Sequence, residues 1–417
     1  MRRRFFLILS LVIVAISPLN SDEALVQELV NDVNNSAFFN FYLMSKGNNP
    51  LFSPFSVHAS FLMAYMGAKG ETAKQISQGI HLTLPYDKIA PTFSALYDSL
   101  YSPKLESSSY EFRIGNAIWV DNRSQILPSY KKTVFDDFHG TIKNVDFADP
   151  VSATAEINAW ALKETAGAIK QFLSPQDITT ATRLLLTNGI ILKGHWKHPF
   201  ETKKTGDKPF LTSLNISKNV PTMHTVGEFP YYEDKHSEYL ALPLSSHENQ
   251  APLALIIFLP KKVSLSKVFE PYYIEQQGDP KNYLTFIDKL KPKKIDLFLP
   301  KFSFNRRIFL KNFFTSIGIT NPFSMSADFS GIDGKKDLFI SNAFHESFIT
   351  VDEGGLFAAA ASGVSFDIKS SLTTADPQKF IVNHPFFYCI LDMKTKLVLF
   401  MGIINDPSLS TPEDKTP

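Results

Sequence analysis

The segment Glu353-Gly-Gly-Leu-Phe-Ala-Ala-Ala-Ala-Ser-Gly363, continued by Val364-Ser-Phe-Asp-Ile-Lys369-Ser370-Ser371, is the most informative stretch of the chain. Its alternate residues 356, 358, 360, 362, 364, 366 and 368 are all apolar or small, which is the period-two pattern of a half-buried strand. The segment nevertheless lies in almost thirty residues without helix caps, between strand-like runs ending near Val351 and beginning near Phe380. That is long for a loop in a compact domain. The segment therefore fits two places, an exposed loop and a strand in a sheet.

Strand-like runs surround this segment and dominate the second half of the chain, whereas helical patterns dominate the first half. The predicted strands are 112–120, 184–192, 253–259, 295–304, 348–351 and 397–404. The predicted helices are 24–44, a helix opened by Pro54-Phe55-Ser56 and continuing to about residue 68, 153–172 and 308–317. No repeat or linker divides the chain, so the pattern predicts one α+β domain with large sheets.

The composition sets limits on the class of protein. The 417 residues are 44% hydrophobic and include 37 Phe, which is enough to build a large core and excludes disorder and coiled coil. Lys and Arg number 42 against 41 Asp and Glu, so the net charge is +1. This balance argues against a nucleic-acid partner, which requires a dense basic face.

The N-terminus predicts export. Three arginines at 2–4 precede the apolar run 5–16, as in a secretory signal peptide, which we place at residues 1–21. An uncleaved membrane anchor is the alternative, but the run is short for a bilayer span, and no membrane partner is expected. The mature protein is then a single domain, 22–417, secreted to the extracellular space and expected to be a monomer. Sequons at Asn34, Asn122 and Asn215 could carry glycans in a eukaryotic host.

The sequence offers little support for an enzyme. It contains no nucleophile elbow, nucleotide-binding loop, zinc-protease motif or calcium loop, so we predict no catalytic residues, no metal and no cofactor. His195 and His198 lack further ligands at recognisable spacing, and Asp328 and Asp333 have the setting of turn formers. The single cysteine, Cys389, lies in an apolar run, so no intrachain disulfide can form.

A set of ordered motifs covers nearly all of the mature chain. They are Asn49-Pro-Leu-Phe-Ser-Pro-Phe-Ser56, Thr187-Asn188, Leu192-Lys-Gly-His-Trp196 with Phe200, Val220-Pro-Thr-Met223, Leu259-Pro260, Leu299-Pro-Lys-Phe302, Ala327-Asp-Phe-Ser-Gly-Ile332, Phe380-Ile-Val-Asn-His-Pro-Phe386 and Leu399-Phe-Met-Gly402. Each motif is weak alone, but in this order they make the chain resemble the serpins.

The resemblance implies an α+β serpin-like fold with about nine helices, three β-sheets and an exposed reactive-centre loop at about 353–379. It also implies a mechanism in which a serine protease cleaves the loop and becomes acylated, and the severed loop then enters the main sheet and distorts the protease before water releases it. Serpin loop insertion is a standard example of strand addition and of stored strain.

The resemblance assigns roles to individual residues. The hinge comprises Glu353, Gly354, Gly355, Leu356, Phe357, Ala358, Ala359, Ala360, Ala361 and Ser362. Family spacing from Glu353 places Lys369 before the scissile bond and Ser370 after it, which suits a trypsin-like protease. The polar cluster beneath the sheet matches Ser53, Ser56, Asn188 and His345, and Trp196 matches the breach; a simple buried hydrogen-bond network is the alternative role for these residues.

Several residues depart from the family pattern. Inhibitory serpins usually have Thr or Ser where this chain has Leu356 and an acidic residue where it has Phe357, and Glu346 replaces a frequent lysine. The bulk of Leu356 would slow insertion and favour turnover of the chain as a substrate. The loop is also long enough for the scissile bond to lie near Leu372 instead.

These features leave three functions to weigh. The sequence predicts a secreted suicide-substrate inhibitor of a trypsin-like serine protease, with a non-inhibitory carrier, chaperone or storage protein as the alternative. An enzyme is a third possibility with no motif behind it. Activation by glycosaminoglycans has little support, because residues 85–101 contain only one basic side chain, Lys88.

Overall fold

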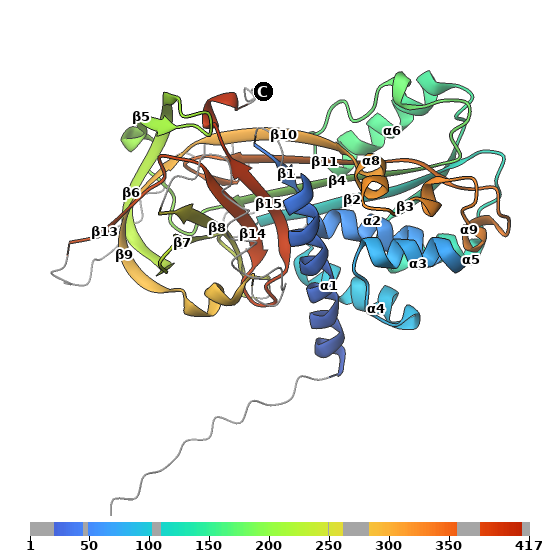
Figure 1. Ribbon diagram of the computed structural model, residues 1–417, viewed down its shortest axis with the longest axis horizontal. Coiled ribbons are helices and arrows are strands. Elements are labelled where there is room, and N and C mark those ends of the chain that lie inside the picture. Colours follow the sequence, from blue (N-terminus) through green and yellow to red (C-terminus); the bar gives the residue numbers. More distant parts are fainter. Residues whose placement is uncertain are drawn as a thin grey trace, which may run out of the picture.

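In the described part of the chain, two β-sheets and the helices that pack against them form the molecule (Figure 1). The computed structural model describes residues 21–44, 49–101, 110–248, 250–261, 283–356 and 376–410. The predicted signal peptide, apart from Ser21, and the loop residues 357–375 lie outside these ranges.

The described part of the chain contains eight α-helices and several short 3-10 turns. The helices are α1 (Ser21–Met44), α2 (Pro54–Gly67), α3 (Gly70–Gly79), α4 (Tyr86–Leu100), α5 (Pro128–Asp136), α6 (Pro150–Glu164), α8 (Leu310–Ser316) and α9 (Ser330–Asp333). The 3-10 turns are η1 (Pro175–Asp177), η2 (Thr202–Lys204), η4 (Thr285–Lys289), η5 (Asn321–Phe323) and η6 (Pro407–Leu409).

The strands run through the chain from residue 51 to residue 404. They are β1 (Leu51–Phe52), β2 (Tyr110–Asp121), β3 (Thr141–Val145), β4 (Leu184–His195), β5 (Gly206–Leu211), β6 (Ser217–Glu233), β7 (Ser237–Pro243), β8 (Leu253–Pro260), β9 (Lys291–Pro300), β10 (Phe302–Phe309), β11 (Ile340–Val351), β12 (Gly355–Leu356), β13 (Gln378–Ile381), β14 (Phe386–Asp392) and β15 (Val398–Ile404).

The six-stranded sheet has the order β10-β11-β12-β4-β2-β3. Strands β11 and β4 pair directly with each other in parallel along most of their length, from Ile340↔Leu184 to Ser347↔Ile190. The two-residue strand β12 lies between them at one end of the sheet. Strands β11 and β4 are therefore separated by β12 at that end of the sheet and pair directly with each other along the rest.

Helices cover both faces of the six-stranded sheet, with α6 on one face and α2 on the other (Figure 1). Strand β2 approaches α6 so closely that a Cβ on Gly115 would lie 2.7 Å from Glu164. Helix α2 begins at Ser53, whose hydroxyl accepts a hydrogen bond from the Ser56 amide, and Pro54 occupies its first turn. Almost every residue of α2 is buried, so its predicted small and apolar face is a core contact.

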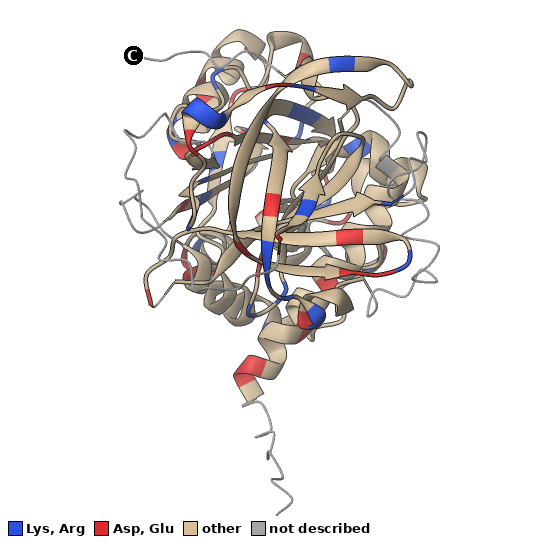
Figure 2. Ribbon diagram, turned by 90° about the vertical axis from the view of Figure 1, so that its left-hand side faces the viewer, with Lys and Arg blue, Asp and Glu red and all other residues tan. Residues whose placement is uncertain are grey.

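The nine-stranded sheet has the order β1-β15-β14-β8-β7-β6-β9-β13, with β5 also paired to β6. Two sheets are therefore present in the described residues where three were expected. The difference arises because the long strand β6 pairs with β9 over residues 222–231 and with β7 over 231–233, so it joins the two parts into one sheet. The view of this sheet in Figure 2 shows acidic and basic residues interspersed, without a broad basic surface on it.

The long helix and most strands are confirmed, and three predicted bounds were wrong. The run 295–304 is two strands, because the chain crosses from one sheet to the other at Lys301. Helix α6 ends at Glu164 rather than 172, because Ala166 and Gly167 have positive φ angles of 47° and 84°. Strand β11 begins at Ile340 rather than 348. Among the described helices, none is both long and apolar enough to cross a membrane.

Candidate functional site

The first residues of the predicted loop occupy a strand position in the six-stranded sheet. Gly355 pairs with His195 and Leu356 pairs with Gly194 on β4, while Leu356 also pairs with Val351 on β11. Leu356 is only 1% exposed. The residue expected to enter the sheet first is thus already inside it. The remaining hinge residues, 357–362, and the predicted scissile pair, Lys369 and Ser370, lie outside the described residues.

A tight turn brings β12 back against β11. The Asp352 amide donates to the Gly355 carbonyl at 3.1 Å, and the Asp352 carboxylate accepts from the amides of Gly354 at 2.8 Å and Gly355 at 3.1 Å. A Cβ on Gly355 would lie 1.8 Å from the carbonyl oxygen of Gly194, so only glycine permits this approach. Burial raises the pKa of Asp352 to about 6, although the two amides act in the opposite direction.

Trp196 connects this turn to the end of β4. Its indole Nε1 donates to the Asp352 carbonyl at 2.8 Å, and its amide donates to the Gly354 carbonyl at 2.9 Å. The Phe200 amide donates to the Glu353 carbonyl at 2.9 Å. Trp196 therefore lies at the end of the sheet where β12 separates β11 from β4, and its side chain is buried; its role in the breach stays a prediction.

Charged and polar side chains fix Glu353 at the start of the hinge. Its carboxylate lies 2.8 Å from the Lys301 ammonium and accepts from the Thr205 hydroxyl at 2.7 Å. Burial acts to raise the pKa of Glu353, but the hydrogen bonds from Lys301 and Thr205 outweigh it and leave the pKa lowered. Lys301 lies where the chain crosses between the sheets, so this ion pair connects the hinge to both sheets.

The predicted polar cluster is assembled by α2, β4 and β11, about midway along the paired strands. The Ser56 hydroxyl and His345 Nδ1 both contact Asn188 Oδ1 at 2.5 Å, and Asn188 Nδ2 donates to the Ser56 carbonyl at 2.9 Å. The Ser53 amide lies 3.0 Å from His345 Nε2. All four side chains are buried. The structure thus brings together residues separated by up to 292 positions in the chain.

These contacts define the tautomer of His345. Because the Ser53 amide can only donate, Nε2 is an acceptor, so Nδ1 carries the proton and donates to Asn188. The Ser347 hydroxyl gives Nε2 a second donor at 2.6 Å. Burial lowers the pKa of His345 to about 3, which keeps the ring neutral at physiological pH.

Sequence reasoning missed several members of the site. Asn116 and Ser60 extend the polar cluster: Asn188 Nδ2 also donates to Asn116 Oδ1, and the Ser60 hydroxyl donates to the same oxygen at 3.0 Å. At the hinge, Asp352 and Lys301 were also missed. The signal for Asn116 was present in the sequence, since an amide inside the apolar strand Ile114-Gly-Asn-Ala-Ile118 must find buried partners.

The hinge and the polar cluster lie on the same line through the sheet. His345 on β11 is the register partner of Asn188 on β4, and β12 ends six residues from that pair, with Leu356 opposite Gly194 and Val351. A strand extended from β12 toward the cluster would pass between His345 and Asn188. The arrangement can therefore gate the admission of a further strand to the sheet.

The three sequons differ in accessibility. Asn34 is buried on α1, where its Nδ2 donates to the Lys396 carbonyl at 2.9 Å and its Oδ1 accepts from the Val398 amide at 3.0 Å. A glycan there would break both bonds, so Asn34 is unsuited to carry one in the folded chain. Asn122 and Asn215 are exposed in turns and keep their amides accessible.

Comparisons with known proteins agree on one family. The family model described as serpin (serine protease inhibitor) matches residues 29–407. An uncharacterised serpin-like protein of Thermococcus kodakarensis is 34% identical, over 91% of this chain and 86% of its own length. The structure of Serpin48, a highly specific serpin of the insect Tenebrio molitor, superposes with a TM-score of 0.78 at 27% identity, covering 93% of this chain and 100% of that one. Human thyroxine-binding globulin in complex with its hormone superposes with a TM-score of 0.79 at 25% identity, covering 92% and 99%.

Proposed function

The chain belongs to the serpin family, whose members are in general protease inhibitors, and from that premise we propose that it is a secreted suicide-substrate inhibitor of a trypsin-like serine protease. The observation that carries the proposal is the position of Leu356, the last residue of the two-residue strand β12, buried between β11 and β4. The sheet accommodates the side chain whose bulk was the main argument against efficient insertion.

The proposed reaction begins with ordinary peptide cleavage. The protease serine attacks the Lys369 carbonyl, the bond to Ser370 breaks, and Ser370 leaves with a protonated amine while Lys369 remains as an ester on the protease. The severed loop then extends β12 through the sheet. Because residues 355 and 356 already lie in β12, insertion of residues 357–368, at roughly 3.3 Å each, would move the attached protease by about 40 Å, which is the scale of a protein domain. Inhibition requires this movement to precede attack of water on the ester.

The register of β12 predicts where each loop residue would lie after insertion. Continuing the pairing of Leu356 with Gly194 and Val351 would place Ala360 opposite Ile190 and Ser347, and Ser362 opposite Asn188 and His345. The alternate residues from 356 to 368 would then share the buried face of Leu356. This agrees with the apolar and small pattern of that set.

Insertion would exchange one polar contact for another. The 2.5 Å contact between His345 and Asn188 must break for a strand to pass between them. Ser362 would arrive at that point with a hydroxyl that can both donate and accept. A polar residue at this one inward position supports the proposal, because buried polar groups without partners are costly.

The same fold supports a second candidate, a non-inhibitory carrier. Phe357 stands where inhibitory serpins usually have an acidic residue, and the chain is also similar to thyroxine-binding globulin, whose structure was determined with its hormone bound. A carrier would be cleaved by proteases without trapping them. The two functions therefore differ in one observable product, the covalent adduct with the protease, which only an inhibitor forms.

Incubation with a trypsin-like protease tests the proposal directly. We expect a covalent adduct that survives SDS, with mass spectrometry placing the cleavage after Lys369, and loss of the adduct in Lys369→Ala. Complete turnover without adduct would instead support the carrier.

A matched pair of variants tests the mechanism within the same assay. Ala360→Glu would place a charge on the buried face of the inserted strand and should convert the inhibitor into a substrate. Phe357→Glu introduces the same charge on the opposite face, opposite Lys193 in the continued register, and should still form adduct. Adduct formation by Ala360→Glu would show that the proposed register is wrong.

A further inference from the structure

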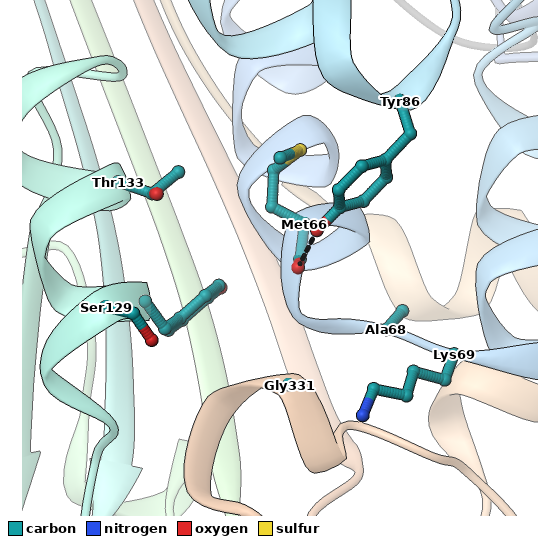
Figure 3. A pocket seen from close by; sticks show the side chains of 8 residues that line it. Met66, Ala68, Lys69, Tyr86, Ser129, Thr133 and Gly331 are labelled. Atoms are coloured by element: carbon teal, nitrogen blue, oxygen red, sulfur yellow. Dashed lines mark hydrogen bonds between the residues drawn. The ribbon is translucent and has the colours of Figure 1, made fainter.

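A pocket of about 390 Å³ lies beyond the C-terminal end of α2, away from the hinge and the polar cluster (Figure 3). It is lined by Met66, Ala68, Lys69, Tyr86, Ser129, Tyr130, Thr133 and Gly331. Ser53 and Ser56 of the polar cluster are at the other end of α2, about 20 Å away at 1.5 Å per residue. The pocket shares no residue with the site described above.

Backbone contacts fix the elements that form the walls of the pocket relative to one another. Helix α9 touches the end of α2, where a Cβ on Gly331 would lie 2.7 Å from the Gly67 carbonyl oxygen. The Leu127 amide donates to the Ile332 carbonyl at 2.8 Å, which ties the start of α5 to α9. The Lys69 amide donates to the Asp328 carbonyl at 2.9 Å. The cavity is therefore formed in the absence of a ligand.

One wall of the pocket presents aromatic rings and a thioether. The Tyr86 hydroxyl donates to the Met66 carbonyl at 2.9 Å, and the Tyr130 hydroxyl donates to the Met63 carbonyl at 2.7 Å. Both hydroxyls are thus engaged, so the two side chains offer their ring surfaces to the cavity. Tyr86 is 53% exposed, which is high for a large apolar ring in a folded protein.

The other end of the pocket is cationic. Among the described residues that line it, Lys69 is the only charged one, and Figure 3 shows its ammonium group directed toward Gly331. The nearby carboxylate of Asp328 is neutralised by Lys336 at 2.7 Å, which leaves Lys69 without an ion pair in the described part of the chain. Ser129 and Thr133 on α5 line the wall of the cavity opposite Lys69.

We propose that this pocket binds a small amphipathic monoanion, a carboxylate or sulfonate carried on an aromatic or aliphatic body. The anionic group would lie at the Lys69 ammonium, and the apolar body would lie against the rings of Tyr86 and Tyr130 and extend toward Thr133 on the opposite wall. One cation and no carboxylate in the lining match a single negative charge. The volume is in the range of small-molecule sites. The proposal does not depend on protease inhibition.

Two fluorescent probes of the same shape test this site. The anion 8-anilinonaphthalene-1-sulfonate should bind the wild-type protein at one saturable site, and the neutral N-phenyl-1-naphthylamine, which lacks the sulfonate, should bind more weakly. Lys69→Gln should weaken the anion roughly tenfold, in line with loss of one charge-assisted hydrogen bond, and leave the neutral probe unchanged. Thr133→Phe, which fills the cavity, should weaken both probes.

The control is Lys131→Gln, which removes an exposed lysine of α5 that does not line the pocket, and it should change neither affinity. Because Lys69 is itself exposed, its substitution leaves the fold intact, and equal melting temperatures of the two glutamine variants check this. An anion affinity that is the same in Lys69→Gln and Lys131→Gln would overturn the proposal. So would loss of the neutral probe in Lys69→Gln, since that places the effect on shape rather than on charge.

Discussion

Gly355 is the residue on which entry of the hinge into the sheet depends most directly. Any larger residue brings a Cβ to within 1.8 Å of the Gly194 carbonyl oxygen, so β12 has to leave its place between β11 and β4. We expect Gly355→Ala to lower the free energy of unfolding by about 1–3 kcal/mol, the usual cost of forced overpacking. Urea unfolding measures this cost, and hydrogen exchange at the Trp196 amide reports whether the turn has opened.

The matched control for this change is Gly206→Ala, in the exposed strand β5. A Cβ on Gly206 meets no atom within 4 Å, so the same substitution there removes backbone freedom without a clash. Equal stability of the two variants would contradict the assignment of Gly355 as a steric requirement.

Two buried histidines give a second prediction at the residue scale. Both ring nitrogens of His58 on α2 are buried and have no hydrogen-bond partner among the described residues, and burial, aided by His81, lowers the pKa of His58 to about 3. An unfolded histidine titrates near pH 6.5, so the unfolded chain binds a proton that the native chain rejects between about pH 6.5 and 3. Stability is therefore lost as the pH falls through this window, at about 1.4 kcal/mol per pH unit for one histidine.

His58→Leu should remove this dependence without loss of a bond. At pH 8 we expect its free energy of unfolding to equal or exceed that of the wild type, and its advantage should grow by about 1.4 kcal/mol per pH unit between pH 6 and 4. His345→Gln is the contrasting variant, because it breaks the contacts to Asn188 and Ser53 and should be destabilised at pH 8 as well. A parallel pH dependence of His58→Leu and wild type would show that His58 is protonated in the native state.

The comparison has to be made between variants because other groups act in the opposite direction. Burial raises the pKa of Asp32 and of Asp352 to about 6, above the value near 3.9 of an unfolded aspartate. The native chain therefore takes up these two protons first, and its stability rises as the pH falls from about 6 to 4. In the wild type the histidine and aspartate contributions partly cancel, so a flat pH profile would hide both.

At the scale of elements, the sequence predicted strands whose interiors are apolar and failed where polar residues are buried. Strand β4 was found because the apolar triplets Leu184 to Leu186 and Ile190 to Leu192 outweigh the short interruption Thr187-Asn188-Gly189. Strand β11 was found only from residue 348, because its earlier part carries His345, Glu346 and Ser347. Their partners come from α2, β4 and β10, so no local pattern could reveal that these polar side chains are buried.

The site was predictable to a similar extent. Family motifs identified Ser53, Ser56, Asn188 and His345, whereas Asp352 and Lys301 act through a turn and a crossing between sheets that only the three-dimensional structure defines. The period-two pattern predicted that Leu356 faces inward. It could not predict that Leu356 already lies in the sheet, because the alternating pattern is equally compatible with a strand inside the sheet and with an exposed loop that has yet to insert.

The contact between β11 and β4 below the hinge is the element that must open. Ala343 on β11 and Leu186 on β4 are register partners and are both buried, so cysteines at the two positions lie within the range of a disulfide. Oxidised Ala343→Cys/Leu186→Cys should be cleaved by the protease without forming adduct, because the strands cannot part to admit residue 364. The reduced form of the same protein should form adduct and serves as its own control. Adduct formation by the oxidised protein would rule out passage of the loop between these strands.

At the scale of the whole molecule, the proposed function requires the intact chain to lie above its lowest free energy. Insertion would bury the inward side chains of Val364, Phe366 and Ile368, worth about 5–8 kcal/mol at the usual gain per buried apolar side chain. The cost is the opening of the β11–β4 contact, part of which Ser362 would recover at the polar cluster. The proposed function requires this balance to favour the inserted state once the peptide bond is cut and the loop is free to move.

We therefore expect the nicked protein to melt at a higher temperature than the intact protein. A gain of this size corresponds to a rise of about 10 °C in a chain of this length, since larger proteins shift by about 1–2 °C per kcal/mol. The measurement is a calorimetric scan before and after limited cleavage of the loop by a catalytic amount of protease. Nicked Ala360→Glu supplies the control, because a charge on the buried face should block insertion and remove most of the rise. Equal melting temperatures for the intact and nicked wild-type chains would leave the trapping reaction without a driving force and would favour the carrier.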